Sequence, residues 1–87
     1  MAANCDVELS LYPLRTGTLE PVIEDFVQHL RVCGLTPTVG CMSTVLHGEV
    51  GAVFDAVGKA FAASAASNEV VLVMKVSNAC PRPRAEP

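Results

Sequence analysis

The sequence predicts an α+β domain with a ferredoxin-like βαββαβ sandwich, in which a four-stranded antiparallel sheet carries two helices on one face. Three observations predict this fold. Apolar and polar residues alternate near the N-terminus, two later segments repeat apolar residues at helical spacing, and the last apolar run is continuous. The 87 residues suffice for a single domain, which we expect over residues 1–81, followed by a flexible tail over 82–87.

The first strand is predicted over residues 5–12, because side chains of opposite character alternate there. The apolar set is Val7, Leu9 and Leu11, and the polar set is Glu8, Ser10 and Tyr12. We expect the apolar set to face the helices and Pro13 to end the strand, since proline cannot donate to a ladder. The first helix is predicted over residues 19–33, with Gly34 ending it in the left-handed conformation.

The second half of the chain is predicted to contain two short strands, a helix and a last strand. Two short strands are predicted over residues 37–41 and 43–49, and an alanine-rich helix over 50–66. Phe54 is expected on the apolar face of that helix, in the core. The last strand is predicted over residues 69–76.

The last strand also predicts an oligomer. The run from Val70 to Val76 is almost continuously apolar, which is typical of a strand buried on both faces. The helices cover one face of the sheet only, so a second copy of the chain is the simplest cover for the other. We therefore expect a homodimer or homotetramer formed by sheet packing.

Composition excludes several classes of partner. The net charge is −3 and Lys and Arg are not clustered, so we expect no binding to nucleic acid. Apolar runs are too short to span a membrane, and the N-terminal residues do not resemble a signal peptide, so we expect a cytoplasmic protein without membrane contact. Nucleophile-elbow, dinucleotide-binding and P-loop motifs are absent, so we predict no enzyme and no catalytic residues.

The four cysteines are expected to be reduced thiols, most of them buried. The alternative is a metal site formed by Cys41, Cys80 and His47. Their spacing matches no zinc-binding pattern, so no metal is predicted.

Polar residues in otherwise apolar strands are the candidate ligand contacts. Small hydroxyls, an aromatic ring and a carboxylate together suit a flat heteroaromatic ligand. The candidates are Glu8, Ser10, Tyr12, Ser43 and Thr44. Two alternatives stay open: these residues form hydrogen bonds across a dimer, or Glu8 pairs with Lys75 on the neighbouring strand instead of a ligand.

Three segments, read together, resemble the YkoF-like thiamine/hydroxymethylpyrimidine-binding family. They are the first-strand motif Leu9–Leu14, the pair Ser43–Gly48 with Val53–Asp55, and the closing motif Ser77–Pro81. Their order and spacing cover nearly the whole chain, from Val7 to Pro81.

The resemblance implies a non-catalytic protein that binds thiamine or hydroxymethylpyrimidine between paired domains, for transport, storage or sensing, with no further cofactor. Some members carry two domains in tandem, so this single domain is expected to pair between chains. Ser10, Tyr12, Ser43 and Thr44 match motif positions, whereas Glu8 is assigned on its chemistry, as a charge-assisted partner of thiamine. The alternative function is a regulatory protein–protein interaction module with the same fold.

Overall fold

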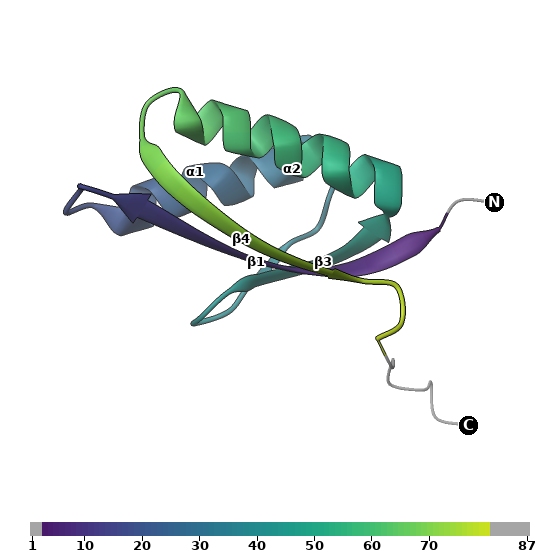
Figure 1. The fold of residues 1–87 in the computed structure, drawn as a ribbon. Helices are drawn as coiled ribbons and strands as arrows, with labels where there is room; N and C mark the ends of the chain where they lie inside the picture. The colour runs from purple at the N-terminus through teal and green to yellow at the C-terminus, as the bar shows by residue number, and fades with distance from the viewer. Residues whose placement is uncertain (1–2, 81–87) are drawn as a thin grey trace.

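The chain forms a four-stranded sheet with both helices on one face, as the sequence predicts (Figure 1). The computed structural model describes residues 3–80. Its elements are β1 (Asn4–Leu14), α1 (Leu19–Val32), β2 (Thr38–Val39), β3 (Thr44–Glu49), α2 (Val50–Ala65) and β4 (Glu69–Ser77). The strand order across the sheet is β2-β3-β1-β4, and each neighbouring pair is antiparallel. The ferredoxin-like fold is confirmed, whereas the predicted tail over 82–87 and Pro81 lie outside the described residues.

Strand β1, at the centre of the sheet, has the two faces that its alternation predicts. The side chains that face the helices are almost fully buried, and they are Cys5, Val7, Leu9 and Leu11. The alternate residues Asp6, Glu8 and Ser10 are only partly buried, and Tyr12 is exposed. Because neighbouring strands extend this pattern, one face of the sheet joins the core and the other stays open.

The core lies between the sheet and the two helices. Helix α1 contributes Phe26 and Leu30, and α2 contributes Val53, Val57 and Ala60. Alanine at the helix–sheet contact lets the two layers approach closely, and the larger side chains fill the remaining space. The core therefore fixes which face of the sheet is left for a ligand or a partner.

The prediction that Pro13 ends the first strand is wrong. Strand β1 continues to Leu14, and Pro13 lies opposite Val70 of β4. Beyond Leu9, β1 is paired with β4 alone. At Pro13, β1 therefore has a partner strand on one side only, and proline is tolerated at such an edge position.

Two further details differ from the predictions. Strand β2 contains only Thr38 and Val39, because Pro37 precedes it and Gly40 turns the chain, donating its N–H to the Ser43 carbonyl oxygen at 2.8 Å. Phe54 is 52% exposed and is not in the core. The buried stripe of α2 runs through Val53, Ala56, Val57, Ala60 and Ser64, and Phe54 lies to one side of it.

The predicted end of the first helix is confirmed. Gly34 has a φ of +94°, its N–H donates to the Arg31 carbonyl oxygen at 2.9 Å, and the Leu35 N–H donates to the Leu30 carbonyl oxygen at 3.1 Å. At the start of α2, both oxygens of the Glu49 carboxylate accept backbone N–H groups, from Gly51 and Ala52. Within residues 3–80, neither helix is long and apolar enough to cross a membrane.

The face of the sheet away from the helices is partly apolar. Val71 and Val73 of β4 are 45% and 46% exposed, and Tyr12 lies opposite Val71 on β1. The helix side of β4 is only partly buried, at Val70, Leu72 and Met74. In the single chain, the apolar residues of β4 that face away from the helices are therefore in contact with solvent.

Candidate functional site

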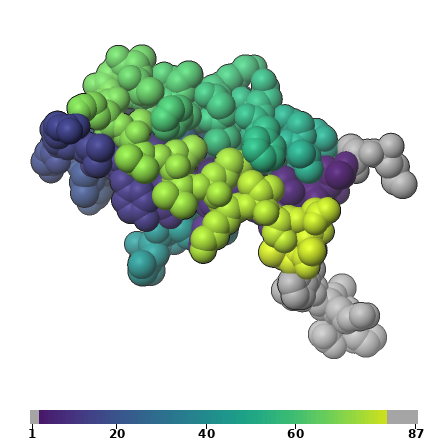
Figure 2. All heavy atoms as spheres, viewed as in Figure 1, coloured from purple at the N-terminus to yellow at the C-terminus, as the bar shows by residue number. Residues whose placement is uncertain are grey.

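A hollow on the open face of the sheet is the candidate ligand site. Its volume is about 580 Å³, within the roughly 300–1,000 Å³ typical of small-molecule sites. The β2–β3 turn and the segment after β4 both project from this side of the sheet (Figure 2). The lining residues are Asp6, Val7, Glu8, Thr36, Thr38, Val45, Leu46, His47, Lys75, Val76, Ser77 and Cys80.

Strand register brings the polar lining residues together in two rows across the sheet. In one row, Glu8 of β1 lies between Val45 of β3 and Lys75 of β4, and Thr38 of β2 lies opposite Val45. Side chains that are directly opposite in an antiparallel sheet lie close enough to interact. This row therefore places a carboxylate between an apolar side chain and an ammonium group.

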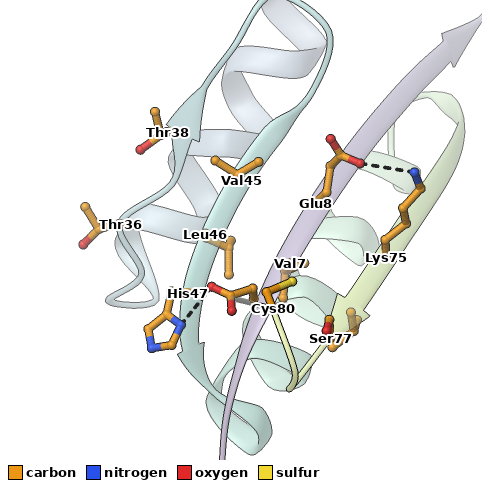
Figure 3. Close-up of a pocket in the computed structure, with 12 residues that line it drawn as sticks. Val7, Glu8, Thr36, Thr38, Val45, Leu46, His47, Lys75, Ser77 and Cys80 are labelled. Carbon is orange, nitrogen blue, oxygen red and sulfur yellow. Dashed lines mark hydrogen bonds and ion pairs between the residues drawn. The ribbon is translucent and has the colours of Figure 1, made fainter. Parts of the chain in front are cut away.

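The second row lies two residues along β1. Asp6 is opposite His47 of β3 on one side and Ser77 of β4 on the other. The Nδ1 atom of His47 is 3.1 Å from Oδ1 of Asp6, and both side chains are partly exposed (Figure 3). Asp6 and Glu8 thus place two carboxylates on the same face of β1. Each lies beside a basic side chain from a different neighbouring strand, His47 of β3 and Lys75 of β4.

Glu8 makes two contacts with different strength. The Ser43 hydroxyl donates a hydrogen bond to Oε2 at 2.8 Å, and Nζ of Lys75 is 3.5 Å from Oε1. The hydrogen bond from Ser43, followed by the positive charge of Lys75, lowers the pKa of Glu8 from its ordinary value. Glu8 is therefore a carboxylate at neutral pH and accepts hydrogen bonds only.

Of the two alternatives left open for Glu8, the pairing with Lys75 is present in the structure. The two side chains point toward each other across β1 and β4 (Figure 3). Both are substantially exposed, with 78% of the Lys75 side chain and 44% of the Glu8 side chain in contact with solvent. The ion pair and a ligand contact are not exclusive, because a mobile lysine in water is easily displaced.

The predicted ligand contacts do not all lie in the hollow. Glu8 lines it, and Ser43 reaches it through its hydrogen bond to Glu8. Ser10 and Tyr12 are on the same face of β1 but farther from Asp6, and they do not line the hollow. Thr44 is on the opposite face, where it is only 6% exposed, so its predicted place beside the other hydroxyls is wrong.

Thr44 faces the core because adjacent residues in a strand point to opposite faces. Ser43 precedes β3 on the open side, so Thr44 must point toward the helices, as Leu46 does. Of the neighbouring residues Ser43 and Thr44, only one can therefore point its side chain toward the site.

Several lining residues were not among the predicted ligand contacts. Asp6 continues the alternation of Glu8 and Ser10 and could have been found from that signal. His47 and Thr38 could not, because their place beside Asp6 and Glu8 depends on the register between strands.

The alternative metal site does not form. No group of three or more His, Cys, Asp or Glu side chains within residues 3–80 is arranged to hold a metal ion. Cys80 lines the hollow beside β4, whereas Cys41 is in the β2–β3 turn and does not. All four cysteines are free thiols, but only Cys5 is buried, so the expectation that most are buried is wrong.

Comparisons with solved structures support the fold. A domain of unknown function from Bacillus cereus superimposes with a TM-score of 0.75 at 24% identity, covering 87% of this chain and 76% of that one. A proposed thiamine biosynthesis/salvage protein from Thermotoga maritima has a TM-score of 0.75 at 21% identity, covering 84% and 81%. A Streptococcus pneumoniae protein has a TM-score of 0.78 at 22% identity, covering 85% and 84%. At these identities the likeness concerns the fold alone.

Sequence comparison identifies the family. No curated protein matches the chain. The family model for thiamine-binding proteins matches residues 7–81, which include all of the described strands and helices except the first three residues of β1. This span agrees with the motif resemblance between Val7 and Pro81, and the chain belongs to the thiamine-binding protein family.

Proposed function

We propose that this protein binds thiamine or its hydroxymethylpyrimidine half, without catalysis, in the hollow on the open face of the sheet. The observation that carries the proposal is the pair of carboxylates, Asp6 and Glu8, at the centre of a hollow of about 580 Å³ in a member of the thiamine-binding protein family. Transport, storage or sensing are the roles that suit binding without chemistry. The cytoplasmic location stays a prediction.

The chemistry of the hollow suits both halves of thiamine. The thiazolium ring is a cation, and an ionised Glu8 offers it a charge-assisted contact. Thr36, Thr38 and Ser77 supply hydroxyls that donate to ring nitrogens or accept from an amino group. Apolar side chains such as Val45 provide a surface for a flat ring. The proposal includes no cofactor.

We further propose that a second copy of the chain covers the open face and completes the site. Tyr12, Val71 and Val73 are exposed on that face beside the hollow. Burial of such side chains favours association. In this arrangement Ser10 and Tyr12 lie at the contact between copies, where they can reach a ligand held by either one. Thr44 has no part in the site because it faces the core.

Isothermal titration calorimetry with thiamine and with hydroxymethylpyrimidine tests the proposal. We expect saturable binding, and we expect Glu8→Gln to weaken thiamine binding by roughly 10- to 100-fold, because a charge-assisted contact is lost. Glu20→Gln is the matched control, since Glu20 is an exposed glutamate in the first turn of α1, away from the hollow. It should leave both affinities unchanged.

Two results would contradict the proposal. One is the absence of heat and of any thermal shift at millimolar ligand. The other is equal weakening by Glu8→Gln and Glu20→Gln, which would place the ligand elsewhere. Recovery of a distinct protein partner by a chain that binds neither ligand would favour the regulatory interaction module instead.

A further inference from the structure

Lys75 has a special position in the hollow. Among the described residues that line the hollow, it alone carries a permanent positive charge. It is directly opposite Glu8 in the β1–β4 register, with Nζ 3.5 Å from Oε1. A cationic ligand that contacts Glu8 therefore comes close to the Lys75 ammonium group.

The ion pair between Lys75 and Glu8 is exposed to solvent and costs little to separate. The Lys75 side chain is 78% exposed and extends from β4, which is at the edge of the sheet. Exposed ion pairs contribute little to stability, because water solvates both charges when they separate. The Ser43 hydroxyl donates a hydrogen bond to the other carboxylate oxygen of Glu8 at 2.8 Å, and this contact does not involve Lys75.

The charge of the lining favours one cation in addition to Lys75. Among the described residues that line the hollow, the acidic side chains are Asp6 and Glu8, and Lys75 is the one lysine or arginine. These residues therefore include one acidic side chain, and one formal negative charge, in excess of the lysine. A bound monocation balances that charge, but it also experiences repulsion from Lys75, whereas an uncharged ligand experiences neither effect.

We propose that Lys75 is an internal counterion that competes with cationic ligands for Glu8 and thereby sets the selectivity of the hollow between cationic and neutral ligands. This inference rests on the proposed function, because it concerns the same site. Lys75 lowers the affinity for a cationic ligand, because binding must either move the Lys75 ammonium group away from Glu8 or hold two positive charges close together. It leaves an uncharged ring, which binds through hydroxyls and apolar contacts, almost unaffected.

The test compares thiamine, a cation, with uncharged hydroxymethylpyrimidine in calorimetry at low ionic strength and mildly alkaline pH. Lys75→Met removes the charge and keeps most of the length of the side chain, and Lys75→Gln repeats the change with a polar residue in case methionine alters association. Lys59→Met is the matched control, because Lys59 is also exposed and paired with a carboxylate, at 3.0 Å from Asp55, but on α2. Circular dichroism and thermal melting check that each variant is folded.

We expect both Lys75 variants to bind thiamine roughly 3- to 30-fold more tightly than wild type, the range for removing one like charge near the surface. Binding of hydroxymethylpyrimidine should change less than about twofold, since no charge meets Lys75. Lys59→Met should change neither. Added salt should reduce the gain, because it screens the repulsion that the variants remove.

Other outcomes overturn the inference in distinguishable ways. If wild type binds thiamine and both Lys75 variants bind it equally or more weakly, Lys75 is inert or is itself a ligand contact, and only this inference fails. An equal gain for both ligands also overturns it, because charge then plays no part. If wild type and every variant bind neither ligand, the proposed function fails together with the inference.

Discussion

At the residue scale, the candidate site depends on how Glu8 is held. One carboxylate oxygen accepts a hydrogen bond from Ser43, which lies just before β3, and the other faces Lys75 on β4. The first contact is short and links two parts of the chain that are 35 residues apart. The second is long and exposed. Ser43 therefore positions the Glu8 carboxylate, and the ammonium group of Lys75 offsets its negative charge.

Replacement of Ser43 by alanine should raise the pKa of Glu8 toward its ordinary value of 4.5, because the hydrogen bond from Ser43 is the largest cause of its lowered pKa. Carbon-detected NMR titration of the glutamate carboxyls measures this shift directly. Ser10→Ala is the control, since the Ser10 hydroxyl is on the same face of β1 but is not bonded to Glu8. An unchanged titration of Glu8 in Ser43→Ala would show that the hydrogen bond does not form in solution.

At this scale the sequence predicted the site only in part. The alternation in β1 correctly placed Glu8 on the open face, and the same rule would have included Asp6 and excluded Thr44. The identity of the basic neighbours is a different problem. The sequence offered Lys75 as one alternative partner of Glu8, but it did not place His47 beside Asp6, because that pair depends on strand register and so on packing across the whole sheet.

At the element scale, the start of α2 is held by a charged cap. Both oxygens of Glu49 accept backbone N–H groups, from Gly51 at 3.0 Å and from Ala52 at 2.9 Å. These hydrogen bonds lower the pKa of Glu49 from its ordinary value of 4.5. The cap immediately follows β3, so it also fixes where the strand that carries His47 turns into the helix.

Glu49→Ala should lower the melting temperature by roughly 4–8 °C at neutral pH, the effect of losing one typical cap in a domain of this size. Because folding lowers the pKa of Glu49, its contribution is fully present above pH 4.5 and disappears as the pH falls through the folded-state pKa. Thermal melts of wild type and variant should therefore converge in acid. A difference that stayed constant from neutral pH to pH 3 would exclude an ionised cap as its source.

Replacement of two glycines by alanine, one just after α1 and one within α2, should change stability in opposite directions. Gly34 has a φ of +94°, so alanine there is strained and should destabilise the fold by about 1–2 kcal/mol. Gly58 is an exposed residue within α2 and an added Cβ meets nothing within 4 Å, so alanine should stabilise the fold by about 0.5–1 kcal/mol. Urea unfolding measures both. Destabilisation by Gly58→Ala would indicate that α2 packs closely on another surface at that point.

The boundaries of most elements could be predicted because local signals define them. Gly34 ends α1 as expected, and the order of helices and strands follows from apolar spacing. The position of Phe54 could not be predicted in the same way. Helix α2 is so rich in alanine and valine that its apolar residues surround much of the helix, and the pattern does not identify the centre of the buried stripe.

At the scale of the whole molecule, the sheet divides the chain into a closed side and an open side (Figure 1). The helices cover the first, and the second holds both the hollow and the exposed apolar residues of β1 and β4. Binding and association are therefore expected to share one face. A change that blocks association should also change ligand affinity if a second copy completes the site.

Val73→Lys tests this coupling, because Val73 is 46% exposed on the open face, opposite Ser10, and does not line the hollow. We expect association to weaken by roughly 100-fold or more, since a charge would be buried at the contact. Size-exclusion chromatography with light scattering should then find the mass of one chain. Calorimetry on the same variant should find weaker thiamine binding, while circular dichroism stays that of the wild type.

The control is Val32→Lys, the same substitution at a residue that is 75% exposed at the end of α1, on the covered side of the sheet. It should change neither mass nor affinity. If Val73→Lys becomes monomeric and still binds thiamine as wild type does, each chain holds a complete site and the partner only shields apolar surface. If wild type is itself monomeric and binds thiamine, association is not part of binding.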